Sequence, residues 1–328
     1  MLALPESTNC QGFSLVELMV ALALGSVLTL AVATLFLRSK ISYLQDEQMA
    51  RLQENGRYAL RYLTRELEMS GYLDGALSGR RVEGGPPGVG CFNHMLDIAV
   101  PLEHYDNTDI HGVPQLRIAA LPAGCVPARS LVAGADVLLT RRVVASPAIA
   151  QSVTLTPLDP NAIFMQRRVV AGSYSLVTGR AAAAAAAAAI DSAWHYAPSL
   201  LFLRRYSVTA GDDIPTLCRR RISLTAHRMA PTECFVEGVQ DMQLEFALDD
   251  DGDNLIDRMV SAPTAVELQR AVAVRLHLLL RSVNPVNGYT NRHSYSLGGK
   301  VVLAANDAFY RRVVRTTVPL RNALARRL

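Results

Sequence analysis

The first forty residues contain a short polar segment followed by a long apolar run. From Leu18 to Leu37 no charged residue occurs. A helix of about 20 apolar residues is long enough to cross the roughly 30 Å hydrocarbon core of a bilayer. The pattern therefore predicts a leader over residues 1–12 and a membrane-spanning helical half over residues 13–37.

The helical pattern continues beyond this run, but with one polar side. Residues 38–72 contain no proline and are rich in strong helix formers. Positions of one face recur at roughly helical spacing: Leu44, Gln48, Leu52, Ala59, Leu63 and Leu67. We expect an amphipathic half that lays this face on a soluble domain. Ser70-Gly71 is its predicted end, because glycine commonly caps a helix C-terminus.

The remainder, residues 73–328, changes to glycine- and proline-rich turns and short β-type runs. These runs are residues 136–144, 152–155, 200–208, 216–224, 239–248, 271–280, 300–303 and 313–320. Several alternate apolar and polar residues, as strands with one covered face do. They predict a mainly antiparallel β-sheet domain behind the helix, an α+β fold. The nearly continuous run 271–280 predicts a central strand, with His277 as a sheet residue and not a ligand.

Glu17 is the one charged residue in the membrane-length segment. An acid inside a membrane helix costs roughly 2.5–3.5 kcal/mol and by default marks a functional group that has a partner. Cleavage after Gly12 would create that partner, because it frees a positive α-amine on Phe13, one helical turn from the carboxylate. An ordinary single-pass anchor, with Glu17 near the interface, stays as an alternative. A secretory signal peptide fits badly, because the run is longer than the apolar region of such a peptide.

Composition limits the remaining choices. The net charge of +4, which becomes +5 without residues 1–12, is too small to indicate nucleic-acid binding. Removal of the leader deletes Cys10 and leaves an even number of cysteines: Cys91, Cys125, Cys218 and Cys234. Outside the cytoplasm this favours two disulfides over free thiols. Of the three pairings we favour Cys91–Cys125 and Cys218–Cys234, which are nearest in sequence.

An acidic loop stands out near the end of the run 239–248. Asp249, Asp251, Asp253 and Asp257 occupy positions 1, 3, 5 and 9 of an EF-hand-like spacing, with the main-chain carbonyl of Leu255 at position 7. Asn254 holds position 6, where a left-handed residue is needed, and asparagine tolerates that conformation. Position 12 is Val260 and not the bidentate glutamate of an EF-hand. We expect a structural Ca²⁺ site, with a metal-free turn as the alternative.

Other polar clusters carry weaker signals. Glu103-His104-Tyr105-Asp106, with Asp109 and His111, contains metal-ligating types but no fixed ligand spacing, and we interpret it as a polar surface loop. No nucleophile elbow, zinc-protease, P-loop or dinucleotide fingerprint occurs. The sequence therefore predicts a protein that is not an enzyme.

The N-terminal segment GFSLVELMVALALG, residues 12–25, resembles the class III signal of type IV pilins and type II secretion pseudopilins. In that family a prepilin peptidase cuts after the glycine and N-methylates the new first residue. The glutamate at the fifth mature position then neutralises the terminal amine of a neighbouring subunit. The resemblance implies cleavage after Gly12, methylation of Phe13 and an assembly role for Glu17.

The rest of the chain is similar to the PilW family of minor pilins. The similar segments, in family order, are ENGRYALRYLTRELEMSGYL, GADVLLTRR, FVEGVQDMQLEFALDDDGDNLID, AVAVRLHLLLRS and VVRTTVPLRN. The resemblance implies a type IV pilin-like fold and a part in priming assembly and in the pilus tip. Implied partners are other minor pilins, the major pilin, prepilin peptidase and a tip adhesin. The chain would sit in the inner membrane with a periplasmic domain, and later in the pilus at the cell surface.

Two other functions remain open at this point. A J-type minor pseudopilin of type II secretion shares the N-terminal signal, although the aspartate loop and the VPLRN ending favour the pilus. A membrane-anchored periplasmic enzyme or binding module is the third hypothesis.

Overall fold

The computed structural model describes residues 12, 14–73, 90–98, 100–106, 121–122, 124–127, 130–168, 174–184, 190–223 and 228–324. The chain divides into two units, residues 1–49 and residues 50–328. One long helix, α1 (Leu15–Met69), supplies the described part of the first unit and the start of the second.

Helix α1 has 55 residues and ends where the sequence predicts. Gly71 has φ +80°, the left-handed conformation that favours glycine after a helix. Its N–H donates to the carbonyl of Arg141 at 2.9 Å, which ties the end of the helix to the β-domain. The observed bounds fall slightly inside the predicted Phe13–Tyr72.

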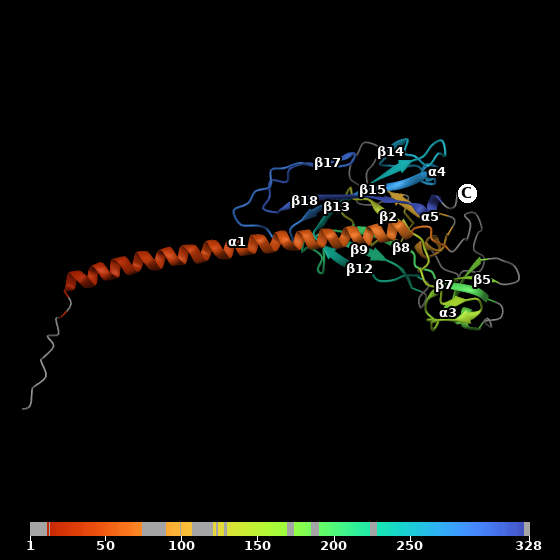
Figure 1. Cartoon of the computed structure of the whole chain (residues 1–328), viewed down its shortest axis with the longest axis horizontal. Coiled ribbons are helices and arrows are strands. Elements are labelled where there is room, and N and C mark those ends of the chain that lie inside the picture. The colour runs from red at the N-terminus through yellow and green to blue at the C-terminus, as the bar shows by residue number, and fades with distance from the viewer. Residues whose placement is uncertain are drawn as a thin grey trace, which may run out of the picture. The chain divides into compact units, whose positions relative to one another are not determined.

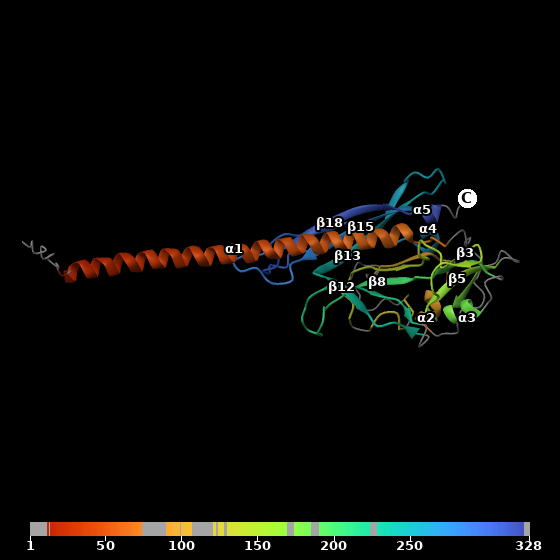
Figure 2. The same cartoon turned by 60° about the horizontal axis from the view of Figure 1, so that its bottom comes forward.

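A four-stranded antiparallel sheet has the order β14-β13-β15-β18. Its strands are β13 (Val239–Leu248), β14 (Arg258–Val260), β15 (Ala271–Arg281) and β18 (Arg311–Pro319). Strand β15 pairs along its length with β13 and β18, so it is internal, as its continuous apolar run predicts. Figures 1 and 2 both show β13, β15 and β18 beside the C-terminal part of α1.

A second antiparallel sheet has the order β1-β2-β8-β9-β12. Its strands are β1 (Leu102–Tyr105), β2 (Val137–Thr140), β8 (Ser199–Arg204), β9 (Thr216–Arg220) and β12 (Glu233–Glu237). Side chains alternate between two buried faces, because Leu138 and Leu201 belong to one core cluster and Leu139 and Leu200 to another. The sheet is thus covered on both sides.

Residues 141–198 form an insertion between two adjacent strands. Thr140 at the end of β2 pairs with Ser199 at the start of β8. Between them a third antiparallel sheet has the order β4-β3-β7-β5-β6. Its elements are β3 (Ile149–Ala150), β4 (Val153–Thr154), β5 (Ile163–Arg168), β6 (Tyr174–Thr178), α3 (Gly179–Ala184) and β7 (Ile190–His195). Sequence reading predicted only its residues 152–155 as a strand.

Short elements complete the described chain. They are α2 (Cys91–Met95), α4 (Ala265–Leu268), α5 (Arg321–Leu324), and the strand pairs β10 (Ile222–Ser223) with β11 (Arg228–Met229) and β16 (Tyr295–Leu297) with β17 (Lys300–Val302). The chain contains a run of nine alanines, residues 181–189, of which residues 185–189 lie outside the described residues.

The main core lies between the C-terminal part of α1 and both large sheets. Leu52, Ala59, Leu63 and Leu67 are each at most 3 % exposed and pack in one cluster with residues of β2, β8, β13 and β15. A Cβ added at Gly56 would lie 2.2 Å from Leu280 Cδ1. Any larger residue would force the Leu280 side chain to shift, so this glycine favours close packing of helix on strand. Leu44 differs from the prediction, because its side chain is 45 % exposed.

Candidate functional site

The N-terminal part of α1 exposes its apolar side chains. Between Leu15 and Leu37 the large apolar side chains are 51 % to 74 % exposed. By length and composition this helix can cross a membrane. A helix that is apolar on all sides is stable in an apolar medium or when it packs against the helices of other chains.

Glu17 lies in the first turn of this helix. Its Oε2 accepts a hydrogen bond from the backbone N–H of Ser14 at 3.2 Å, and Ser14 Oγ accepts from the N–H of Val16 at 3.3 Å. This arrangement resembles a capping box, in which a serine and a glutamate satisfy the free N–H groups of a helix start. Within the described residues no lysine or arginine pairs with Glu17. The carboxylate is therefore capped locally but carries an uncompensated charge.

The predicted cleavage site lies just before the helix. Gly12 is exposed and has no atom within 4 Å of an added Cβ. Phe13 and residues 1–11 lie outside the described residues. An exposed glycine is sterically open to a peptidase.

Glu66 is the buried counterpart of Glu17 at the other end of α1. Its side chain is 4 % exposed and receives two bonds from Arg142, Nη2 to Oε1 at 2.8 Å and Nε to Oε2 at 3.1 Å. Thr140 Oγ1 adds a third donor at 3.3 Å. Burial acts to lower the pKa of Arg142, and the bonds and charge of Glu66 outweigh it and raise the pKa. This glutamate has its cation within its own chain.

Two models of known protein families match this chain, one near each end. Residues 205–322 match the family model Type IV Pilus-assembly protein W (PilW). Residues 7–33 match the prokaryotic N-terminal methylation motif. The chain carries the two matches of a PilW-family pilin.

These matches indicate a minor pilin of a type IV pilus, and both families are structural and not enzymatic. The methylation motif and the apolar helix anchor the precursor in the inner membrane, from which it passes into the pilus. The PilW match contains the whole four-stranded sheet, whereas the insertion 141–198 lies outside it. No curated protein and no solved structure matches the chain.

The acidic loop lies within the PilW match and connects β13 to β14. Carboxylate oxygens of Asp249, Asp251 and Asp257 lie within 4.8 Å of one another. Asn254 has φ +66°, so the left-handed residue predicted at position 6 is present. Asp253 is not part of this group, and its Oδ1 accepts the N–H of Leu255 at 2.7 Å. The structure thus gathers three of the four predicted carboxylates.

The charges of the loop are unevenly compensated. Arg258 Nε lies 2.6 Å from Asp250 Oδ2, and this bond and the nearby arginine charges lower the pKa of Asp250. In the described chain no arginine or lysine pairs with Asp251 or Asp257. Three converging carboxylates repel one another, and hard oxygen donors of this kind suit Ca²⁺.

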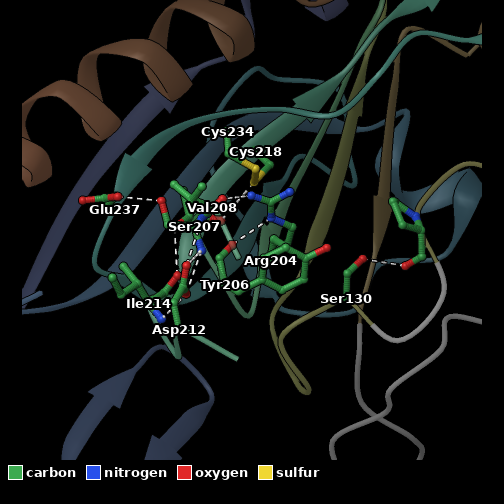
Figure 3. The surroundings of a disulfide bond; sticks show 12 residues. Ser130, Arg204, Tyr206, Ser207, Val208, Asp212, Ile214, Cys218, Cys234 and Glu237 are labelled. Atoms are coloured by element: carbon green, nitrogen blue, oxygen red, sulfur yellow. Dashed lines mark hydrogen bonds between the residues drawn. A yellow bond between two sulfur atoms is a disulfide. The ribbon is translucent and has the colours of Figure 1, made fainter. Parts of the chain in front are cut away.

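Both disulfides favoured from sequence are formed. Cys91 in α2 bonds Cys125, and Cys218 in β9 bonds Cys234 in β12. Figure 3 shows the second bond near the loop that follows β8. There Asp212 accepts the backbone N–H groups of Ser207, Val208, Thr209 and Ile214. Burial acts to raise the pKa of Asp212, and these four donors outweigh it and lower the pKa to about 2.

The prediction of a polar surface loop at residues 103–106 is wrong. Residues 102–105 form strand β1, and His104 is buried with its Nε2 2.9 Å from Asp136 Oδ2, without hydrogen-bond alignment. Burial raises the pKa of Asp136, and His104 opposes this effect. Asp109 and His111 lie outside the described residues. His277 is a sheet residue as predicted, with its Nε2 2.9 Å from Glu245 Oε2.

Sequence reading missed a network on the other side of β1. Glu103 Oε1 lies 2.5 Å from Arg141 Nη1, and Glu103 Oε2 lies 2.8 Å from His94 Nε2 and also bonds Tyr105. Burial acts to raise the pKa of Glu103, and the bond from His94 and the charge of Arg141 lower it to about 2. This network joins α2 to β1 and β2. The sequence did not predict this network, because His94 and Arg141 are distant from Glu103 in the chain.

Proposed function

We propose that this PilW-family minor pilin takes part in priming type IV pilus assembly and in the tip complex of the pilus. The observation that carries the proposal is the charge of Glu17, which has no cation among the described residues and stands in a bare apolar helix. An acid in such a medium is stable only beside a positive group.

The positive group would come from a neighbouring subunit. Prepilin peptidase cuts after Gly12 and methylates the new amine of Phe13, which stays positively charged. Helices of neighbouring pilins pack side by side, and the carboxylate of one meets the amine of the next. Burying either charge alone is costly, so only partners in the correct register assemble. Other minor pilins and the major pilin are the proposed neighbours, and a tip adhesin is a further one.

The capping role of Glu17 determines how the proposal is tested. Glutamine at this position keeps the cap of the helix but removes the charge. Alanine removes both. We expect Glu17→Gln and Glu17→Ala both to be cleaved by the peptidase, and both to lose co-purification with other minor pilins and surface piliation. Lys40→Gln serves as a matched control that removes a charge outside the apolar run.

Full assembly in Glu17→Gln together with loss in Glu17→Ala would show that the cap and not the charge matters, which refutes the proposal. Normal piliation in both variants would refute it as well.

The PilW match favours a pilus over the type II secretion alternative. Neighbouring genes separate the two cheaply, because a pseudopilin would lie among secretin-operon genes and a minor pilin among pilin genes. A membrane-anchored enzyme or binding module would keep its first twelve residues, so N-terminal mass spectrometry addresses that alternative.

We also propose that the β13–β14 loop binds a structural Ca²⁺. The support is the convergence of Asp249, Asp251 and Asp257 within 4.8 Å, beside a left-handed Asn254. Titration calorimetry on the full chain in detergent should show Ca²⁺ heat that Asp251→Asn removes. Asp46→Asn, which changes an exposed acid on α1, should leave the heat unchanged. Equal heats for Asp251→Asn and the wild type, or no heat at all, would rule the site out.

A further inference from the structure

Three arginines lie along the exposed side of the C-terminal part of α1. Arg57, Arg61 and Arg65 are spaced four residues apart, so they form one stripe on the helix, and all three are exposed. We name this stripe the arginine face. Like charges at this spacing repel and destabilise an isolated helix.

The acids of the same chain compensate this face only weakly. Arg57 Nη1 lies 3.8 Å from Glu54 Oε2, with side chains 68 % and 64 % exposed, and such an exposed pair contributes little. Among the described residues neither Arg61 nor Arg65 has an ion pair. Glu66 points into the domain and is bound by Arg142, and the exposed Glu68, three residues after Arg65, forms no ion pair with it among the described residues.

The opposite side of this helix segment is unavailable to partners. Leu52, Ala59, Leu63 and Leu67 are buried in the core of the β-domain. A second copy that approached through the same helix segment would present the same three arginines together with Glu54 and Glu68, so its exposed side would also be net positive. Two arginine faces would repel each other, so this surface selects against self-association through α1.

We propose that the arginine face docks the N-terminal helix of a different pilin, whose exposed side carries aspartate or glutamate residues. The proposal rests on the proposed function, in which α1 packs against helices of neighbouring pilins. Charge complementarity identifies the occupant, because arginine binds carboxylates through two parallel hydrogen bonds. The helix places the three arginines on one stripe at four-residue spacing, which matches acids at the same spacing on a partner helix.

Photo-crosslinking in piliated cells tests this docking. Tyr58 is 45 % exposed and lies three and seven residues before Arg61 and Arg65, on the same side of the helix. Replacing it by benzoylphenylalanine in the full chain places the crosslinker beside the arginine face. Mass spectrometry should locate the crosslink in the helix of another prepilin-type protein, next to acidic residues.

Charge variants of the same crosslinking chain complete the test. We expect Arg61→Glu with Arg65→Glu to reduce the crosslink about tenfold or more, because like charges then face each other. Arg61→Lys with Arg65→Lys should keep most of it. Unchanged non-reducing gel mobility, which reports both disulfides, shows that the variants are folded.

Several results would overturn the proposal. These are a crosslink only to a second copy, to lipid or to nothing, and equal yields in the glutamate and lysine variants. Measuring the same crosslink in Glu17→Ala distinguishes failure of this docking proposal from failure of the proposed function. If Glu17→Ala abolishes the crosslink and the arginine reversals do not, the docking proposal fails while the assembly role of Glu17 stands. If the crosslink forms in full without Glu17, the assembly role fails instead.

Discussion

The two ends of α1 belong to one helix but differ in what covers them. The apolar side chains between Leu15 and Leu37 are bare, whereas Leu52, Leu63 and Leu67 are at most 3 % exposed. The glutamates follow the same division. Glu66 is bound by Arg142 and Thr140, whereas among the described residues Glu17 accepts a hydrogen bond only from the backbone N–H of Ser14. One end is therefore completed by its own chain, whereas the other exposes an apolar helix and, under the proposed function, receives its cation from a neighbouring subunit.

The largest expected effect is on folding stability, and it compares an apolar side chain from each end of α1. Leu63→Ala should lower the free energy of unfolding by about 2–5 kcal/mol, because it leaves a cavity in the core. Leu24→Ala, which is 66 % exposed, should leave it unchanged within about 0.5 kcal/mol. Urea titration of the full chain in detergent, followed by fluorescence of the single tryptophan, Trp194, measures both. Equal losses for the two variants would contradict the division.

The next effect compares the two glutamates. Glu66→Gln should cost about 2–3 kcal/mol, because it leaves the guanidinium of Arg142 half-buried without its counter-charge. Glu17→Gln should leave the unfolding of the β-domain unaltered and act only on assembly. The same urea titration checks the first statement and co-purification the second. A stable Glu66→Gln domain would mean that Arg142 finds another partner.

The smallest effect is on the free energy of unfolding at acidic pH. The pKa of Glu103 is lowered from its ordinary value of 4.5 to about 2 in the folded protein. Its contribution is therefore fully present above about pH 4.5 and is lost as pH falls toward 2. Glu103→Gln should lose this pH dependence between pH 4.5 and 2. A variant that keeps the same acid slope as the wild type would show that other carboxylates carry it.

Local signals account for what the sequence predicts. The length of the apolar run and the spacing of Leu52, Leu63 and Leu67 predict the helix. The alternation of apolar and polar residues predicts β13, and the nearly continuous apolar run predicts β15. The Ser14–Glu17 cap was also readable, since serine followed three residues later by glutamate is a helix-start signature. The insertion was missed, because its strands are short and their polar faces blur the alternation. His104 was misread because its partner Asp136 is set by the pairing of β1 with β2, which no local pattern shows.

The most direct test of the central claim is the mass of the N-terminal peptide of this chain in isolated pili or in a purified minor-pilin complex. We predict a peptide that begins at methylated Phe13, co-isolated with other pilins. A chain recovered in those assemblies with residues 1–12 still attached would contradict the account, since Phe13 would then carry no free amine to meet Glu17.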